Sequence, residues 1–316
     1  MSTPRVVITG GAGFLGSHLC SYYVDAGWDV VAVDNLSSGL TRNVASMQGS
    51  ESFSLVQADV TKPLELEGSF DLVLHFASLA SPPYYKQFPI ETLEVGAIGT
   101  QRMLELAVKN DARFVFASTS EVYGDPEVHP QVESYYGHVN PIGPRSMYDE
   151  SKRYAEALIM AYQSAKNANA GMVRIFNTYG PRMRSDDGRV VTNFLTQILA
   201  GQPLTIHGDG TQTRSFCFVD DLVAGIADYA ASDLKRPVNL GDPDTEMSIR
   251  DLAQRLSTLF DRPFTAAPPM PRQDENDPMR RNPDITLARK TLGWQPKVTF
   301  EDGMRETAAW LKAVDG

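Results

Sequence analysis

The sequence Gly10-Gly11-Ala12-Gly13-Phe14-Leu15-Gly16 stands between the β-branched run Arg5–Thr9 and a helix-like segment. A glycine-rich turn in this context predicts the strand-turn-helix unit of a dinucleotide-binding fold. Gly10 permits the sharp turn, Gly13 lets the backbone approach a pyrophosphate, and Gly16 permits close helix packing. The following helix N-terminus offers unpaired N–H groups and the positive end of its dipole. We therefore expect this turn, with Phe14 and Leu15, to bind a dinucleotide.

Short β-branched runs alternate with helix-like segments through the first half of the chain, which is typical of a parallel sheet wrapped by helices. We expect an α/β fold with a Rossmann-type doubly wound parallel sheet. The predicted strands are Arg5–Thr9, Asp29–Asp34, Phe53–Val56, Leu72–Phe76, Arg113–Ser118 and Met172–Phe176. The clearest predicted helices are Phe14–Ala26, Ile90–Lys109 and Tyr148–Lys166.

The rhythm changes after about residue 180, where short elements alternate with loops rich in Gly, Pro and Asp. Residues 1–177 are predicted to form an NAD-binding domain that can regain a segment around 212–240. Residues 178–316 are predicted to form mostly a smaller substrate-binding lobe. The long helices at 90–109 and 148–166 are apolar on more than one face, which favours a helix-on-helix interface and a homodimer.

The amino-acid composition of the chain argues against two classes of binding partner, membranes and nucleic acids. Apolar residues make up 42% of the 316 residues, and no apolar run approaches the roughly 20 residues that cross a bilayer. The N-terminal residues run straight into a predicted strand and leave no room for a leader, so we expect a soluble, cytoplasmic protein without a membrane partner. A net charge of −10 without a basic stripe argues against nucleic acid.

Metal and disulfide chemistry are not indicated. The two cysteines, Cys20 and Cys217, lie far apart in the sequence and favour buried thiols. The five histidines show no ligand spacing, so we predict no metal and assign them to structure or surface, with a place in the pocket for one of them as the alternative: His18, His75, His129, His138 and His207.

A carboxylate at the end of the second predicted strand indicates which dinucleotide binds. Asp34 stands at the distance from the glycine turn where a carboxylate can bind both hydroxyls of an adenine ribose. It would repel a 2′-phosphate, and Asn35 rather than an arginine follows, so NAD is favoured over NADP. The remaining predicted cofactor contacts follow the third, fourth and fifth strands: Asp59, Val60, Ala77, Ser78, Ala80 and Ser118.

Tyr148 and Lys152 are four residues apart in a predicted helix, which places both side chains on one face. Bringing a tyrosine pKa from ~10 to near 7 requires about 4 kcal/mol of phenolate stabilisation. An adjacent ammonium and a bound nicotinamide cation can supply it. Together with the glycine turn, this spacing predicts an acid/base pair and therefore an enzyme.

Three polar residues end the fifth predicted strand, at the edge of the sheet where such folds bind ligands. Thr119 is placed to hydrogen-bond a reacting hydroxyl, and Ser120 and Glu121 add a polar group and a carboxylate beside it. A second proton-handling unit beyond Tyr148 predicts a reaction more complex than a simple oxidation.

These pieces, and longer stretches beside them, resemble the extended short-chain dehydrogenase/reductase family and, within it, the branch of UDP-glucuronate decarboxylases. The resemblance covers nearly the whole chain and is densest in Ala117–Arg153. The matching stretches are Glu121–Pro126, Gly137–Ser146, Arg174–Met183, Asp187–Val191 and Gly208–Phe216.

The resemblance implies a UDP-sugar substrate, UDP-glucuronate, and residues that hold it. Arg189 and Arg214 would supply the cations for the diphosphate, and Arg281 would lie near the sugar carboxylate. Arg182 and Arg184 are interpreted as surface residues. The full set of predicted substrate contacts is Pro82, Tyr85, Glu121, Asn177, Arg189, Val190, Val191, Leu204, Thr205, Ile206, Gln212, Arg214 and Arg281.

Two residues depart from the family pattern. Glu94 stands where similar enzymes usually carry a lysine near the substrate, and a carboxylate there would repel a uronate unless it points away. Ser151 replaces a small Gly or Ala between Tyr148 and Lys152, which we expect to be harmless at an outward helix position.

The expected reaction oxidises C4 of the sugar, with Tyr148 taking the hydroxyl proton, and loses CO2 from the resulting 4-keto uronate. C5 is then reprotonated, and return of the hydride from bound NADH to C4 gives UDP-xylose. The catalytic residues expected to take part are Tyr148, Lys152, Thr119, Ser120, Glu121 and Arg281. A sugar-nucleotide 4,6-dehydratase usually carries an Asp at the Ser120 position, and a 4-epimerase usually lacks the glutamate. A catalytically silent NAD sensor is disfavoured by the intact Tyr148 and Lys152.

Overall fold

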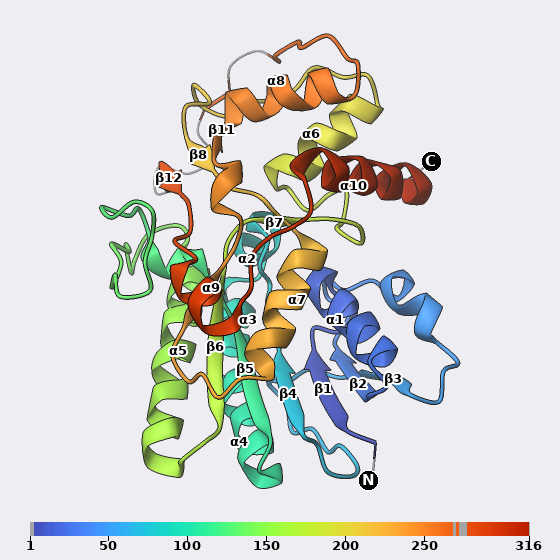
Figure 1. Cartoon of the computed structure of the whole chain (residues 1–316), viewed down its shortest axis with the longest axis vertical. Coiled ribbons are helices and arrows are strands. Elements are labelled where there is room, and N and C mark those ends of the chain that lie inside the picture. The colour runs from blue at the N-terminus through green and yellow to red at the C-terminus, as the bar shows by residue number, and fades with distance from the viewer. Residues whose placement is uncertain (1–2, 268–269, 272–276, 316) are drawn as a thin grey trace.

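The computed structural model describes residues 3–267, 270–271 and 277–315. Within this part of the chain, seven parallel strands form one sheet in the order β10-β6-β5-β4-β1-β2-β3 (Figure 1). The order reverses between β1 and β4, and ligands of such sheets bind beyond the carboxyl ends of the strands at this point. The seven strands are β1 (Arg5–Thr9), β2 (Asp29–Asp34), β3 (Phe53–Gln57), β4 (Leu72–His75), β5 (Arg113–Thr119), β6 (Ala170–Ile175) and β10 (Val238–Leu240).

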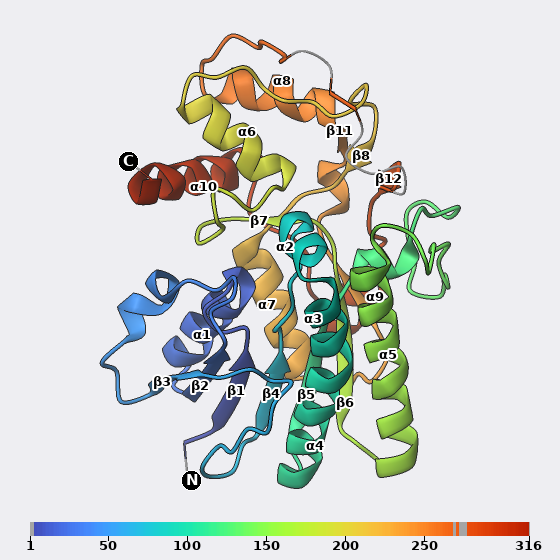
Figure 2. The ribbon, with the colours of Figure 1, turned by 180° about the vertical axis from the view of Figure 1, so that it is seen from behind.

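Helices cover both faces of this sheet, as Figures 1 and 2 show from opposite sides. Alternate residues of a strand point to opposite faces, so Val6 and Ile8 of β1 join one apolar cluster while Val7 joins the other. The first cluster packs on α1 (Phe14–Asp25), α7 (Val219–Ala230) and α9 (Thr286–Leu292). The second packs on α4 (Thr100–Asn110) and α5 (Ser146–Lys166). This arrangement confirms the predicted Rossmann-type α/β fold.

The helix predicted at Ile90–Lys109 contains a local change of winding. It is built from α3 (Pro89–Glu94), a π-helical turn η2 (Val95–Gly99) and α4. A Cβ on Gly96 would lie only 2.6 Å from the Cβ of Ser151 on α5, so the two helices cross in close contact there. Ser151 is 2% exposed and its Oγ donates to the Tyr148 carbonyl at 2.7 Å. The outward position expected for Ser151 is therefore wrong, because Gly96 leaves room for it inside.

The chain after residue 178 forms most of a lobe beyond the carboxyl ends of the strands, at the top of Figure 1. Strand β10 and helices α7 and α9 return from this part of the chain to the main sheet. No helix in the described ranges is long and apolar enough to cross a membrane. The lobe contains α6 (Val190–Leu199), α8 (Ile249–Leu259), α10 (Phe300–Asp315), a sheet of β8 (Thr213–Arg214), β11 (Met247–Ser248) and β12 (Arg280–Arg281), and a pair of β7 (Thr178–Tyr179) and β9 (Cys217–Phe218).

Shorter elements complete the description. They are the 3₁₀ turns η1 (Thr41–Met47), η3 (Ser120–Tyr123) and η4 (Pro243–Thr245), and the helix α2 (Pro82–Gln87).

Candidate active site

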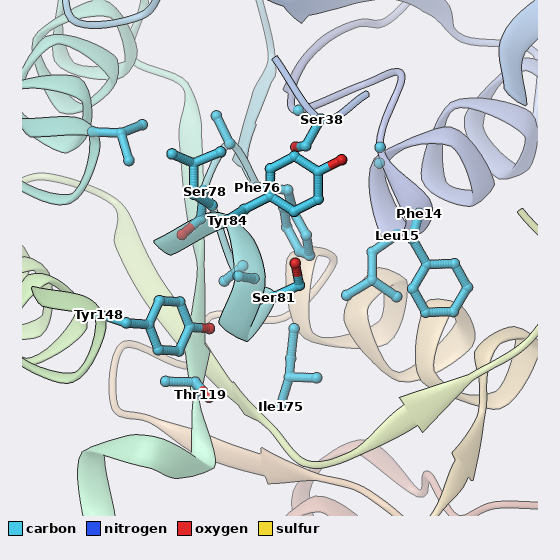
Figure 3. Close-up of a pocket in the computed structure, with 18 of the residues that line it drawn as sticks. Phe14, Leu15, Ser38, Phe76, Ser78, Ser81, Tyr84, Thr119, Tyr148 and Ile175 are labelled. Carbon is cyan, nitrogen blue, oxygen red and sulfur yellow. The ribbon is translucent and has the colours of Figure 1, made fainter. Parts of the chain in front are cut away.

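A cavity of about 500 Å³ lies at the carboxyl ends of the central strands, where the strand order reverses (Figure 3). Every residue predicted to contact the cofactor lines this cavity. They are Gly10, Gly13, Phe14, Leu15, Gly16, Asp34, Asn35, Asp59, Val60, Ala77, Ser78, Ala80, Ser118, Tyr148 and Lys152.

The glycine turn forms the end of this cavity nearest α1. Gly10 has φ +70°, and its N–H donates to the Val33 carbonyl at 2.8 Å. A Cβ on Gly16 would collide with the Gly10 carbonyl oxygen, so the turn and the helix are packed too closely for any other residue. No side chain caps the first turn of α1, and its N–H groups are free to bind phosphate oxygens. These features fit the pyrophosphate of a dinucleotide.

Asp34 forms the neighbouring wall and is 7% exposed. Its carboxylate accepts hydrogen bonds from the N–H groups of Ala12 at 3.0 Å and Leu36 at 2.8 Å. Burial raises the pKa of Asp34, and these main-chain bonds oppose the rise. The bonds fix the carboxylate beside the turn, where it fits the ribose hydroxyls of NAD.

Tyr148 and Lys152 lie on the inner face of α5, buried at 7% and 3% exposure. The Lys152 ammonium lies 5.6 Å from the centroid of the Tyr148 ring, and it donates to the Ala117 carbonyl at 2.8 Å. The Tyr148 ring stacks on Tyr85 at 5.4 Å between centroids. The four-residue spacing thus brings the two groups together, and the lysine is held by the end of β5.

The pKa values of this pair are shifted in opposite directions by burial. Burial raises the pKa of Tyr148 to about 12, while a hydrogen bond from Thr119 favours the phenolate. Burial lowers the pKa of Lys152 from 10.5 to about 7. The lysine alone therefore does not bring the tyrosine pKa toward 7. A cation bound beside the phenol, such as the nicotinamide ring of NAD, would supply further stabilisation of the phenolate.

Glu121 lies at the start of η3 and is held between two arginines. Its Oε1 accepts from Arg145 at 2.6 Å and its Oε2 accepts from Arg281 at 2.6 Å. Burial raises the pKa of Glu121, but the two guanidinium groups outweigh burial and lower it to about 2. Glu121 is therefore ionised at neutral pH. It cannot donate a proton in the way that a second acid beside Tyr148 would.

A second cavity of about 180 Å³ opens from the first toward the lobe. The two share six lining residues, among them Glu121 and Arg281, so a ligand in one can reach a ligand in the other. The predicted substrate residues that line the second cavity are Pro82, Tyr85, Glu121, Asn177, Arg189, Val190, Thr205, Gln212, Arg214 and Arg281. Val191 lines the first cavity instead.

Leu204 and Ile206 do not present their side chains to either cavity. They are 2% and 6% exposed and belong to the apolar core, on either side of Thr205. The extended backbone turns only the middle side chain of the three toward the cavity. Leu204 and Ile206 therefore stay predicted substrate contacts through their main-chain atoms alone, because their side chains belong to the core.

Several lining residues were missed or misplaced by sequence reasoning. Arg145 and Asp277 line the second cavity together with Lys86 and His207, the last of which had been assigned to structure or surface. Asp277 binds two arginines, Arg145 at 3.4 Å and Arg214 at 2.8 Å. Arg145 lies within the matching stretch Gly137–Ser146, which is the signal that could have found it, and no local pattern marks Asp277.

The interpretation of Arg182 and Arg184 as surface residues is also wrong. Both line the first cavity, and Arg182 donates to the Ser17 carbonyl of α1 at 2.8 Å. Glu94 lies on the first cavity as well, at the end of α3, and is absent from the lining of the second. Glu94 therefore lies on the cavity that holds the predicted cofactor residues and not on the cavity toward the lobe.

No group of three His, Cys, Asp or Glu side chains in the described residues could hold a metal ion. Cys20 and Cys217 are both free and buried.

The sequence comparison identifies the class of protein that this fold and site define. The family model of the NAD dependent epimerase/dehydratase family matches residues 6–241. The chain belongs to this family, and its cofactor is NAD. The resemblance to extended short-chain dehydrogenases/reductases is thereby confirmed.

The chain is also similar to individual members of this family. The chain is 49% identical over 308 residues to UDP-glucuronic acid decarboxylase 1 of Danio rerio, covering 97% of this chain and 72% of that protein. The structure of UDP-glucuronic acid 4-epimerase from Bacillus cereus, in complex with UDP-glucuronic acid and NAD, has a TM-score of 0.85 at 27% identity and covers 98% of this chain and 99% of that one. The dTDP-glucose 4,6-dehydratase of Streptomyces venezuelae has a TM-score of 0.89 at 26% identity, covering 99% and 98%.

Proposed function

We propose that this chain is a UDP-glucuronate decarboxylase that forms UDP-xylose, with NAD recycled within each turnover. The observation that carries the proposal is the buried cluster of Glu121, Arg145 and Arg281 where the two cavities meet. With Arg189 and Arg214 in the same cavity, it offers an excess of positive charge to a substrate that carries a diphosphate and a carboxylate. The 49% identity to a decarboxylase supports the same conclusion.

Tyr148 is the proposed base for the first step. NAD, when bound, supplies the hydride acceptor for C4 and a positive ring near the phenol. Tyr148 Oη takes the proton of the C4 hydroxyl, and the hydrogen bond from Thr119 holds the phenolate in place. Lys152, when protonated, adds positive charge beside the ring from its site on the Ala117 carbonyl.

The second step follows from the chemistry of the oxidised sugar. A ketone at C4 makes the C6 carboxylate part of a β-keto acid, so CO2 leaves with the electron pair passing to an enolate at the C4 oxygen. Tyr148, now protonated, and Thr119 stabilise that oxygen. Arg281 orients the carboxylate, and the ionised Glu121 fixes Arg281 and Arg145 rather than donating a proton.

Two related reactions are less well supported. A 4,6-dehydratase must protonate a departing hydroxyl, and the residue beside Glu121 is Ser120, a poor acid that is 3% exposed. A 4-epimerase needs no group to hold a carboxylate ready for loss. The solved 4-epimerase and 4,6-dehydratase structures described above are only 27% and 26% identical to this chain.

The direct test incubates the purified protein with UDP-glucuronate, with and without added NAD, and follows products by NMR and mass spectrometry. Loss of one CO2 and appearance of UDP-xylose is the expected result. An isomer of unchanged mass would replace the proposal with an epimerase. Loss of water from a UDP- or dTDP-hexose, without reaction of UDP-glucuronate, would replace it with a dehydratase.

The role of Tyr148 is tested by Tyr148→Phe. Removal of the proton-transfer group is expected to lower kcat by roughly 10²–10⁴-fold while NAD binding changes little. The matched control is Tyr162→Phe, which removes a hydroxyl from the same helix at a site where it bonds Glu105. Retention of more than a tenth of the parent kcat in Tyr148→Phe would exclude the assigned role.

We further propose a homodimer that pairs the α3–α5 side of two copies, drawn in front in Figure 2. Large apolar side chains are exposed there: Ile90 (67%), Leu93 (44%), Ile98 (41%) and Tyr154 (50%). Light scattering on a size-exclusion column should give twice the mass of the chain, and Leu93→Glu should reduce the measured mass to that of one chain.

We also propose that residues 1–177, with the returning strand β10, form the NAD-binding domain. We further propose a cytoplasmic location, which agrees with the two free cysteines.

A further inference from the structure

The segment from Pro181 to Gly188 runs along the cofactor cavity from one wall to the other. At its first end, Arg182 donates to the Ser17 carbonyl at 2.8 Å and to Ser21 Oγ at 3.0 Å, both on α1. The amide of Asn43 donates to the Arg182 carbonyl at 3.2 Å. Arg182 also has φ +67°, a turn that points its guanidinium back toward α1. This end is therefore anchored to the helix that follows the glycine turn.

The second end of the segment is packed on the opposite wall. Gly188 has φ +75°, and a Cβ there would lie 2.7 Å from Cγ of Pro83 at the start of α2. Between these two anchored ends, Met183, Arg184 and Asp187 line the cavity.

Arg184 lies in the middle of this segment and contacts both walls. Its guanidinium carbon lies 5.4 Å from the centroid of the Tyr84 ring on α2. One of its N–H groups donates to the Ser38 carbonyl, in the loop after β2, at 3.5 Å. Ser38, Tyr84 and Arg184 all line the cofactor cavity, and we name these three residues the clasp. Figure 3 shows the Tyr84 ring extending across the cavity toward Ser38.

The clasp is held by contacts that can break without unfolding the core. Asp186 binds the Arg184 guanidinium through two bonds of 2.7 and 2.8 Å and raises the pKa of Arg184. The Arg184 side chain is 27% exposed and the Asp186 side chain 63% exposed. Ion pairs at such exposure are weak, so Asp186 orients the guanidinium over Tyr84 without fixing it permanently.

We propose that the clasp sets the residence time of NAD: Arg184 has to leave Tyr84 and Ser38 before the dinucleotide can exchange with solvent. Ser38 follows the strand that ends in Asp34, and Tyr84 lies four residues after Ala80 on the side of the reaction centre. Closure between them spans the cavity between its ribose-binding wall and its catalytic wall. The inference rests on the proposed function, in which one cofactor serves successive turnovers. Loss of the reduced cofactor before the last step would leave the sugar as a ketone.

The test measures dissociation of NAD directly, without any sugar. The parent protein and the variants Arg184→Ala and Tyr84→Leu are loaded with NAD, chased with excess 1,N6-etheno-NAD, and sampled for retained NAD by mass spectrometry. Each variant is expected to release NAD on the order of tenfold faster, the effect of losing a cation–π contact of this kind. The control Arg305→Ala removes an exposed arginine that also pairs with an aspartate, Asp302 at 3.2 Å, and should stay within twofold of the parent.

The double variant Arg184→Ala/Tyr84→Leu decides whether the residues act as one device. Because each single change removes the same contact, the double variant should release NAD no faster than the faster single variant. Release rates within twofold of the parent in both single variants, with unchanged melting temperatures, would overturn the proposal. Multiplied effects in the double variant would also overturn it, since they would indicate separate contacts. The assay uses NAD alone, so a failure of the proposed decarboxylation would appear only in the product assay.

Discussion

The cofactor cavity takes its shape from the main chain, whereas the substrate cavity takes its shape from charged side chains. In the first, Gly10 and Gly16 lie against each other so closely that no Cβ fits, and Asp34 is fixed by backbone N–H groups. In the second, Glu121 and Asp277 hold three arginines through ion pairs. The geometry of the cofactor cavity is therefore fixed when the local strand and helix form. The geometry of the substrate cavity is fixed only when segments that are distant in the sequence come into contact.

This difference predicts different consequences of mutation. A change in the glycine turn should affect dinucleotide affinity and leave the arginines in place. A change in the ion-pair cluster should affect stability and substrate binding together, because the same charges hold the segments and meet the ligand. A substitution in one cavity can therefore be compared with the other cavity, which the substitution leaves unchanged.

The largest effect on stability is expected from Glu121→Gln. The change leaves Arg145 and Arg281 buried side by side without their shared counter-charge, and breaking a buried pair typically costs about 3–5 kcal/mol. Urea unfolding followed by circular dichroism measures this loss. The control Glu301→Gln removes an exposed partner of Arg255 and should cost less than about 1 kcal/mol. Equal losses of unfolding free energy in the two variants would contradict the stabilising role of the buried ion pairs of Glu121.

The pH dependence of the same difference should show when the charge acts. Glu121 has its pKa lowered from 4.5 to about 2, so its contribution is present above pH 4.5 and is lost as the pH falls toward 2. The stability difference between the parent and Glu121→Gln should therefore be constant above about pH 5 and shrink by roughly 3 kcal/mol by pH 2. A difference that does not change with pH would mean that the arginines are not what Glu121 stabilises.

A break on the cofactor side is expected from Gly16→Ala. The new Cβ would collide with the Gly10 carbonyl, and relief of such overpacking costs about 1–3 kcal/mol. Displaced amides would lose charge-assisted bonds to the phosphates, so NAD affinity should fall on the order of a hundredfold in calorimetry. UDP affinity should hold. Gly201→Ala is the control, because Gly201 has open space around it and a positive φ, which Gly16 lacks. An equal loss of NAD affinity in Gly201→Ala would contradict the collision at Gly16 as its cause.

The contrast between the regions also explains what the sequence could reveal. The glycine turn, Asp34 and the Tyr148–Lys152 pair are local patterns, because each depends on residues within one strand-turn-helix unit or one helix. The six predicted strands overlap β1–β6 for the same reason. The resemblance to a family supplied Arg214 and Arg281, which no spacing indicated.

What sequence reasoning missed depends on contacts between distant segments. Arg145 and Asp277 are 132 residues apart and meet only when the lobe closes on the sheet. The burial of Ser151 depends on the absence of a side chain at Gly96, on another helix. The burial of the Leu204 and Ile206 side chains was not predicted, because a matching stretch does not tell which side of the backbone faces the ligand.

The smallest expected effect tests the substrate side through Asp277→Asn. Asp277 places a carboxylate on Arg145 and Arg214, inside the cavity proposed for an anionic substrate. With its side chain 32% exposed, its repulsion of a diphosphate is partly screened. Neutralising it should tighten UDP binding by roughly two- to fivefold at low salt, with less gain at high salt, since partly exposed charge pairs contribute about 1 kcal/mol or less. The control Asp209→Asn changes a solvated carboxylate in the same lobe and should leave UDP affinity unchanged. Weaker UDP binding in Asp277→Asn would mean that the aspartate orients Arg145 and Arg214 more than it competes with the diphosphate for them. The substrate cavity would then resemble the cofactor cavity, because both would be formed before the ligand binds.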